Sequence, residues 1–128
     1  MVTNFEEITK ELSQEDYQLL QQLIRCFEAH DKNNPIKAPK IVLGINNANP
    51  FLKRKFTEVK LRKLVNFIRS KGMIGLIATS DGYYSTKDIA EIKLQIKSLE
   101  ERASAILNSS IGLEYLIQRL EKQKNENV

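Results

Sequence analysis

The chain has 128 residues, of which 41% are hydrophobic and 28% are charged, and its formal net charge is +4. This length predicts one domain with room for an added element, and the composition excludes a wholly disordered chain. No apolar run is long enough to cross a bilayer and no apolar signal segment begins the chain, so we expect a cytoplasmic protein without a membrane span.

Cysteine and histidine each occur once, as Cys26 and His30. One chain therefore cannot assemble a disulfide or a Cys/His zinc site, and we expect neither a metal nor a cofactor. Cys26 lies in an apolar helical pattern, which favours a buried, inert thiol over a reactive one. Because the sequence also lacks a Gly-rich phosphate loop, a nucleophile elbow and a Ser-His-acid arrangement, we expect no enzyme activity.

The first half of the chain predicts two helices after an N-terminal arm at residues 1–12. Ser13 is a candidate N-cap for a helix over residues 14–30, because the apolar residues that follow it recur at helical spacing. Asn and Pro residues then predict a loop that leads into a short helix over residues 39–43, ended by Gly44. The polar segment 45–56 is predicted as a long connection.

A third helix is predicted to begin after Thr57, a candidate N-cap, and to end at Gly72. Its apolar residues fall on one face and are Leu61, Leu64, Val65 and Ile68. The apolar run 73–79, followed by Asp81-Gly82 and two tyrosines, predicts a β-hairpin with its turn at Asp-Gly. Of Tyr83 and Tyr84, one is expected to face the core and the other to support the hairpin or contact a sugar.

The C-terminal part predicts a long helix over residues 88–122, with residues 123–128 as a frayed tail. Its apolar residues alternate in steps of four and three, the pattern of a coiled-coil seam. Either the helix pairs with a second copy, or it packs back on the first helix; residues 108–112 are poor helix formers where it could break. The candidate dimerisation residues are Ile92, Ile96, Leu99, Ala103, Ile106, Leu113, Ile117 and Leu120.

Positive charge is concentrated in the middle of the chain. Residues 32–71 contain eleven Lys or Arg against the single acid Glu58, whereas the remainder carries a net charge of −6. Such separation favours a face that binds a polyanion, and the alternative is a merely solvated basic surface.

The run LRKLVNFIRSKGMIGLIATSDGYYSTKDIAEI resembles the end of the recognition helix and the wing of winged helix-turn-helix proteins of bacteria and phages. The resemblance implies a mainly α fold with a small β-hairpin, in which residues 13–87 form the winged-helix domain and residues 88–122 a helical extension. It also implies a DNA-binding protein without catalysis, either a transcription regulator or a replication accessory of bacterial, phage or mobile-element origin.

In such a domain the N-terminal half of the recognition helix, here residues 57–71, enters the major groove of duplex DNA. Arg and Asn can read bases, and Lys mainly neutralises phosphates. A homodimer would present two such helices to half-sites about one helical turn apart. The alternative function is a protein-interaction module that uses the C-terminal helix. The candidate DNA contacts are Thr57, Lys60, Arg62, Lys63 and Asn66 on the helix, Lys53, Arg54 and Lys55 before it, and Lys37 and Lys40 further upstream.

Overall fold

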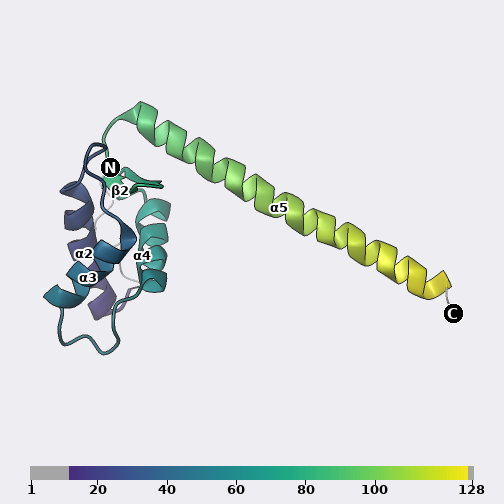
Figure 1. Cartoon of the computed structure of the whole chain (residues 1–128), viewed down its shortest axis with the longest axis horizontal. Helices are drawn as coiled ribbons and strands as arrows, with labels where there is room; N and C mark the ends of the chain where they lie inside the picture. The colour runs from purple at the N-terminus through teal and green to yellow at the C-terminus, as the bar shows by residue number, and fades with distance from the viewer. Residues whose placement is uncertain (1–11, 127–128) are drawn as a thin grey trace. The chain divides into compact units, whose positions relative to one another are not determined.

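The structure is a computed structural model that describes residues 12–126, so the predicted N-terminal arm lies outside the described residues except for Leu12. Within that range the chain is mainly helical and contains one small antiparallel hairpin, which confirms the predicted fold class (Figure 1). The elements are the helices α2 (Gln14–Glu28), α3 (Ala38–Ala48) and α4 (Glu58–Ser70), the strands β1 (Leu76–Thr79) and β2 (Gly82–Ser85), and the helix α5 (Ile89–Glu126).

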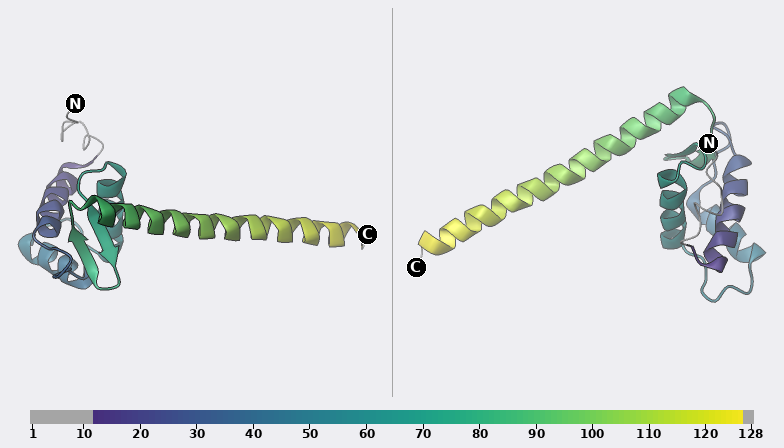
Figure 2. Two further views of the ribbon diagram at one scale, coloured as in Figure 1. Left: turned by 90° about the horizontal axis from the view of Figure 1, so that it is seen from above. Right: turned by 180° about the vertical axis from the view of Figure 1, so that it is seen from behind.

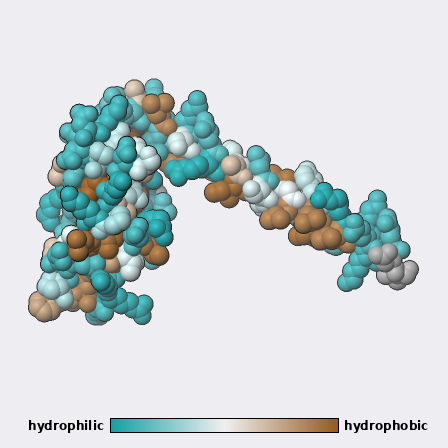
Figure 3. All heavy atoms as spheres, in the orientation of Figure 1, coloured by the Kyte–Doolittle hydropathy of each residue, from teal (hydrophilic) through white to brown (hydrophobic). Residues whose placement is uncertain are grey.

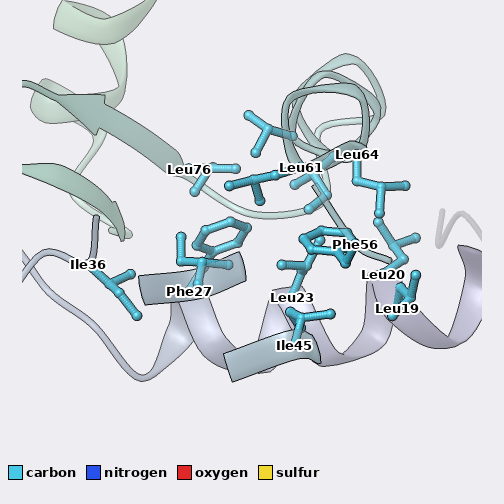
Figure 4. Close-up of a cluster of buried hydrophobic side chains, with 13 residues drawn as sticks. Leu19, Leu20, Leu23, Phe27, Ile36, Ile45, Phe56, Leu61, Leu64 and Leu76 are labelled. Atoms are coloured by element: carbon cyan, nitrogen blue, oxygen red, sulfur yellow. The ribbon is translucent and has the colours of Figure 1, made fainter. Parts of the chain in front are cut away.

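The helices α2, α3 and α4 surround one hydrophobic core. Figure 4 shows Leu23 and Phe27 of α2 meeting Leu61 of α4, with Phe56 inserted from the segment before α4. These side chains are at most 2% exposed, and burying each stabilises the fold by about 1.5–3 kcal/mol. The core therefore fixes which side of α4 faces outward.

The first helix begins as predicted, because the Ser13 hydroxyl accepts a hydrogen bond of 3.1 Å from the Asp16 backbone N–H. It ends at Glu28, two residues earlier than predicted. His30 lies outside the helix because its backbone carbonyl accepts a bond from the Ser85 N–H and its ring Nδ1 lies 2.8 Å from the Asn34 carbonyl oxygen.

The second helix is longer than the sequence predicts, since α3 runs through Gly44 to Ala48. Ile41 and Ile45, one turn apart, are both buried, so tertiary packing outweighs the helix-breaking tendency of the glycine between them. The connection to α4 is correspondingly shorter than the predicted segment 45–56.

The end of α4 confirms the role predicted for Gly72, which has a φ of +60° just after the C-cap residue Lys71. The Gly72 N–H donates to the Arg69 carbonyl and the Met73 N–H donates to the Ile68 carbonyl. This pair of bonds is the Schellman arrangement, which favours glycine at the left-handed position.

The hairpin pairs Leu76 with Ser85 and Thr79 with Gly82 in antiparallel register (Figure 2). The predicted turn is displaced by one residue, because Ser80 and Asp81 form the loop and Gly82 begins β2. Ile36 extends the hairpin, since its backbone exchanges two hydrogen bonds of 2.8 and 2.9 Å with Tyr83. The segment that enters α3 is thereby fixed to the hairpin.

The helix α5 is continuous from Ile89 to Glu126, so it does not break at residues 108–112, and it continues past residue 122, where the frayed tail was expected to begin. A single glycine costs only about 1 kcal/mol in a helix, and the last turn carries Lys124, which favours the helix dipole. The chain divides into two units, Met1–Ile92 and Lys93–Val128, and the boundary falls just after the first turn of α5. No described helix is both long and apolar enough for a membrane crossing.

Candidate nucleic-acid interface

The helix α4 presents a polar face because its apolar face is fixed in the core. The Thr57 hydroxyl caps its N-terminus by accepting a 3.2 Å bond from the Lys60 N–H, as predicted. The predicted apolar face, Leu61, Leu64, Val65 and Ile68, is buried. The opposite side exposes three of the candidate contacts, Arg62, Lys63 and Asn66.

The basic loop before α4 is held at both ends by asparagine side chains of α3 and its C-cap. Asn46 exchanges two hydrogen bonds with the Phe56 backbone, at 2.9 and 3.0 Å. Asn49 exchanges two bonds with the side chain of Gln22 on α2 and donates a third to the Ile45 carbonyl. These bonds hold the loop 50–55 in a defined position beside the N-terminus of α4.

The loop and α4 together line one open hollow of about 580 Å³. Its lining also includes apolar side chains and one acid, Glu15. Five cations around one hollow produce a positive potential that attracts a polyanion more strongly than scattered charges do. Six of the ten predicted contacts meet there, and they are Lys53, Arg54, Lys55, Thr57, Lys60 and Lys63.

Lys60 is the one predicted contact that is neutralised by a partner within the described part of the chain. Its Nζ lies 2.8 and 2.9 Å from the two carboxylate oxygens of Asp16 on α2. The pair is partly exposed, so it contributes at most about 1 kcal/mol to stability. Lys60 is therefore better placed to join α4 to α2 than to contact a phosphate, unlike Lys63, which is exposed.

The remaining predicted contacts lie elsewhere. Arg62 and Asn66 are exposed on α4 but do not line the hollow. Lys37 and Lys40 are exposed at the N-terminus of α3, whereas the basic loop follows the C-terminus of that helix. Lys37 and Lys40 therefore lie at the opposite end of α3, a helix about 16 Å long, from the end that the basic loop follows.

Sequence reasoning missed three features of this surface. The ion pair between Asp16 and Lys60 was not predicted, because it spans 44 positions and has no local signal. The bonds of Asn46 and Asn49 equally depend on the folded arrangement. Phe51, at the loop beside the cations, is 95% exposed, and its place in a Pro-containing polar segment could have indicated this.

The hairpin is braced against the start of α5 by the carboxylate of Glu91. Tyr84 Oη donates to one oxygen at 2.8 Å and Thr86 Oγ1 donates to the other at 2.9 Å. Tyr84 is buried, as expected for one of the two tyrosines. Tyr83 is half-buried and its ring lies 5.6 Å from that of Phe27, so it is engaged with the core.

Replacing Tyr84 with Phe tests this brace through its pH dependence. Burial, followed by the hydrogen bond to Glu91, raises the pKa of Tyr84 above its ordinary value of 10.0. The protonated form is thus favoured in the folded state, so its stabilisation is complete below about pH 10 and is lost as pH rises through the higher folded pKa. We expect Tyr84→Phe to cost about 1.5 kcal/mol at pH 7 and to flatten the loss of stability above pH 10.

Denaturant unfolding at pH 7 to 11 measures this effect, with Tyr115→Phe in exposed α5 as the control. Both variants lose a tyrosine, but only Tyr84→Phe should change the alkaline limb of the curve. Identical curves for the two variants would contradict the brace.

The predicted seam of α5 is exposed over most of its length. Figure 3 shows hydrophobic side chains along this helix, and Ile106, Leu113 and Ile117 are each more than half exposed. Contiguous apolar surface of this kind marks an interaction site.

Two further observations complete the chemistry of the described residues. Burial raises the pKa of the Cys26 thiol, which favours the protonated, less nucleophilic form. No group of three His, Cys, Asp or Glu side chains suited to a metal ion occurs among residues 12–126.

Comparisons with protein-family models, curated proteins and solved structures give no match for this chain.

Proposed function

We propose that residues 13–87 form a winged helix-turn-helix unit that binds duplex DNA. The order of α2, α3, α4 and the hairpin fits this assignment, with α4 as recognition helix and the hairpin as wing. The observation that carries the proposal is the hollow in which loop 50–55 and α4 gather five cations, of which all but Lys60 lack an ion-pair partner among residues 12–126. The chain would act in the cytoplasm as a regulator or replication accessory.

The proposed contacts divide into two kinds. Lys53, Arg54, Lys55 and Lys63 are exposed and would neutralise phosphates. Arg62 and Asn66 are exposed on α4 and have the side chains that read guanine and adenine. The tip of the hairpin contains Asp81 and no cation, so phosphate binding by the wing is not part of the proposal.

A gel-shift titration with random-sequence duplex at several salt concentrations tests the proposal. Four phosphate contacts, made by Lys53, Arg54, Lys55 and Lys63, predict a slope of log affinity against log salt of about −3.6. A slope near zero, or no complex at low salt, would contradict it.

A homodimer through the seam of α5 belongs to the same proposal, because it would present two copies of α4 to DNA. The exposure of that seam also favours the second candidate function, a protein-interaction module in which α5 docks a different partner. The two candidates differ in the gel shift, since only the first requires random duplex to bind.

The ion pair at Lys60 gives the proposal a gain-of-binding test. Replacing Asp16 with Asn removes the negative charge that pairs with Lys60 and so releases Lys60, which lines the hollow. Duplex affinity should therefore rise roughly tenfold at 0.1 M salt, and the slope should steepen by about 0.9. Stability should fall by less than about 1 kcal/mol.

Fluorescence anisotropy with a labelled duplex measures both quantities. Glu28→Gln, which removes the same charge at the other end of α2, is the matched control and should have a much smaller effect. Equal gains in both variants would show that only net charge matters and would remove Lys60 from the interface.

A further inference from the structure

The apolar seam of α5 has an internal size pattern that indicates how it is covered. The seam residues alternate between the a and d positions of a heptad repeat. The d positions are all Ile or Leu, and they are Ile92, Leu99, Ile106, Leu113 and Leu120. The two central a positions, Ala103 and Ser110, are small, whereas the outer a positions, Ile96 and Ile117, are large. The a and d residues together are Ile92, Ile96, Leu99, Ala103, Ile106, Ser110, Leu113, Ile117 and Leu120.

We propose that a second copy of the chain covers this seam with its α5 running antiparallel, centred near residue 108. This inference rests on the homodimer of the proposed function and adds the relative direction of its two α5 helices. It requires α5 to be one uninterrupted helix through residues 108–112, which the structure shows.

Core packing distinguishes the two directions. In a parallel, in-register pair each a residue faces its own copy, so Ala103 would face alanine and Ser110 would face serine. Two small layers would then alternate with the bulky layers of Ile106 and Leu113. Such a core leaves voids at the small layers, and each void the size of a methyl group costs about 1 kcal/mol.

In the antiparallel pair each a residue faces a d residue, and all central layers then have similar volume. Ala103 meets Leu113 of the second copy, and Ser110 meets Ile106. The outer layers join Ile96 with Leu120 and Ile117 with Leu99. Small side chains thus face large ones throughout the middle of the seam, which is the arrangement that interdigitates best.

Charges at the edges of the seam do not decide the direction. In the antiparallel pair Lys93 would face Glu121, which is favourable, but Glu100 would face Glu114, which is not. Both contacts are exposed and each contributes at most about 1 kcal/mol. In the in-register parallel pair Lys93 would face Asp88 of the second copy, which is a similarly weak contact, so the choice between the two directions rests on core volume.

The direction determines where the two N-terminal units are attached. In the antiparallel pair Ile92 lies level with residue 124 of the second copy. The two attachment points are then about 48 Å apart along the paired helices, whereas a parallel pair would place them side by side.

Cysteine cross-linking tests the direction in full-length chains that carry Cys26→Ala. We expect an equimolar mixture of the Ile96→Cys and Leu120→Cys variants to form a mixed disulfide under mild oxidation, identified by its mass. Neither variant alone should form a linked dimer. In the antiparallel pair the two copies of residue 96 lie about 36 Å apart along the helices, and so do the two copies of residue 120, which is too far for a disulfide.

Efficient cross-linking of Ile96→Cys with itself would overturn the antiparallel direction, and so would a dimer that cross-links in none of the three samples. Sedimentation of the unsubstituted chain at tens of micromolar provides the second readout. A monomer there would overturn the second-copy assignment and the dimer part of the proposed function, while DNA binding by the N-terminal unit would be judged separately by the gel shift.

Discussion

Replacing Lys53, Arg54 and Lys55 with Gln is expected to weaken binding to random duplex DNA by about 500-fold at 0.1 M salt. Each lost phosphate contact removes about 0.9 from the magnitude of the salt slope, so the slope should change from about −3.6 to about −0.9. The three side chains are exposed, so the stability of the fold should change by less than about 0.5 kcal/mol.

The matched control removes the same number of positive charges from α5, through Arg119, Lys122 and Lys124 replaced with Gln. These side chains are also exposed, and the net charge falls from +4 to +1 in both variants. The control should retain most of the affinity and the slope. Equal losses in both variants would mean that net charge alone attracts DNA and that the loop is not the contact surface.

Lys60 is left unchanged in this experiment because of its pairing with Asp16. A substitution there would alter the contact between α4 and α2 as well as the charge of the hollow. Loss of binding would then have two explanations. The loop residues avoid this ambiguity, since none of the three makes an ion pair within residues 12–126.

Replacing Gly82 with Ala is expected to destabilise the N-terminal unit by about 3 kcal/mol or more. Gly82 has a φ of +129°, and an added Cβ would lie 2.5 Å from the carbonyl oxygen of Ile36. Backbone strain and backbone overlap therefore act together at one position. Relieving them would require breaking the two hydrogen bonds between Ile36 and Tyr83, which join the entry of α3 to the hairpin.

Thermal unfolding followed by circular dichroism measures this effect, and a loss of about 3 kcal/mol should lower the midpoint by about 12 °C or more. Gly44→Ala is the control, because Gly44 lies inside α3 with nothing within 4 Å of the added carbon. It should stabilise the fold by up to about 1 kcal/mol. A Gly82→Ala variant as stable as the unsubstituted chain would contradict the close approach of Ile36.

Sequence patterns only a few residues long correctly predicted the features that depend only on neighbouring residues. Ser13 and Thr57 cap their helices as predicted, because an N-cap needs only the hydroxyl and the backbone three residues later. The apolar face of α4 followed from helical spacing alone. Gly72 was predicted as a helix end for the same reason, since its left-handed conformation is a property of one residue.

Features that depend on distant residues were predicted wrongly or missed. Gly44 was predicted to end the second helix, but Ile45 is buried and Asn46 bonds to the Phe56 backbone, so the helix continues. The close approach at Gly82 comes from Ile36, which lies 46 positions earlier, so no local pattern could predict it. The charge distribution of the sequence predicted a basic cluster. It could not show that Lys53, Arg54 and Lys55 line the hollow while Lys37 and Lys40 lie at the N-terminus of α3, because that depends on the fold.

The central claim is that loop 50–55 and the exposed face of α4 form one surface that meets duplex DNA. Backbone amide NMR of the full chain, titrated with a short random-sequence duplex at low salt, tests it most directly. The account predicts shifts concentrated in residues 50–66, with the middle of α5 unchanged. Binding that shifts only α5, or no shift at duplex concentrations well above the protein concentration, would contradict it.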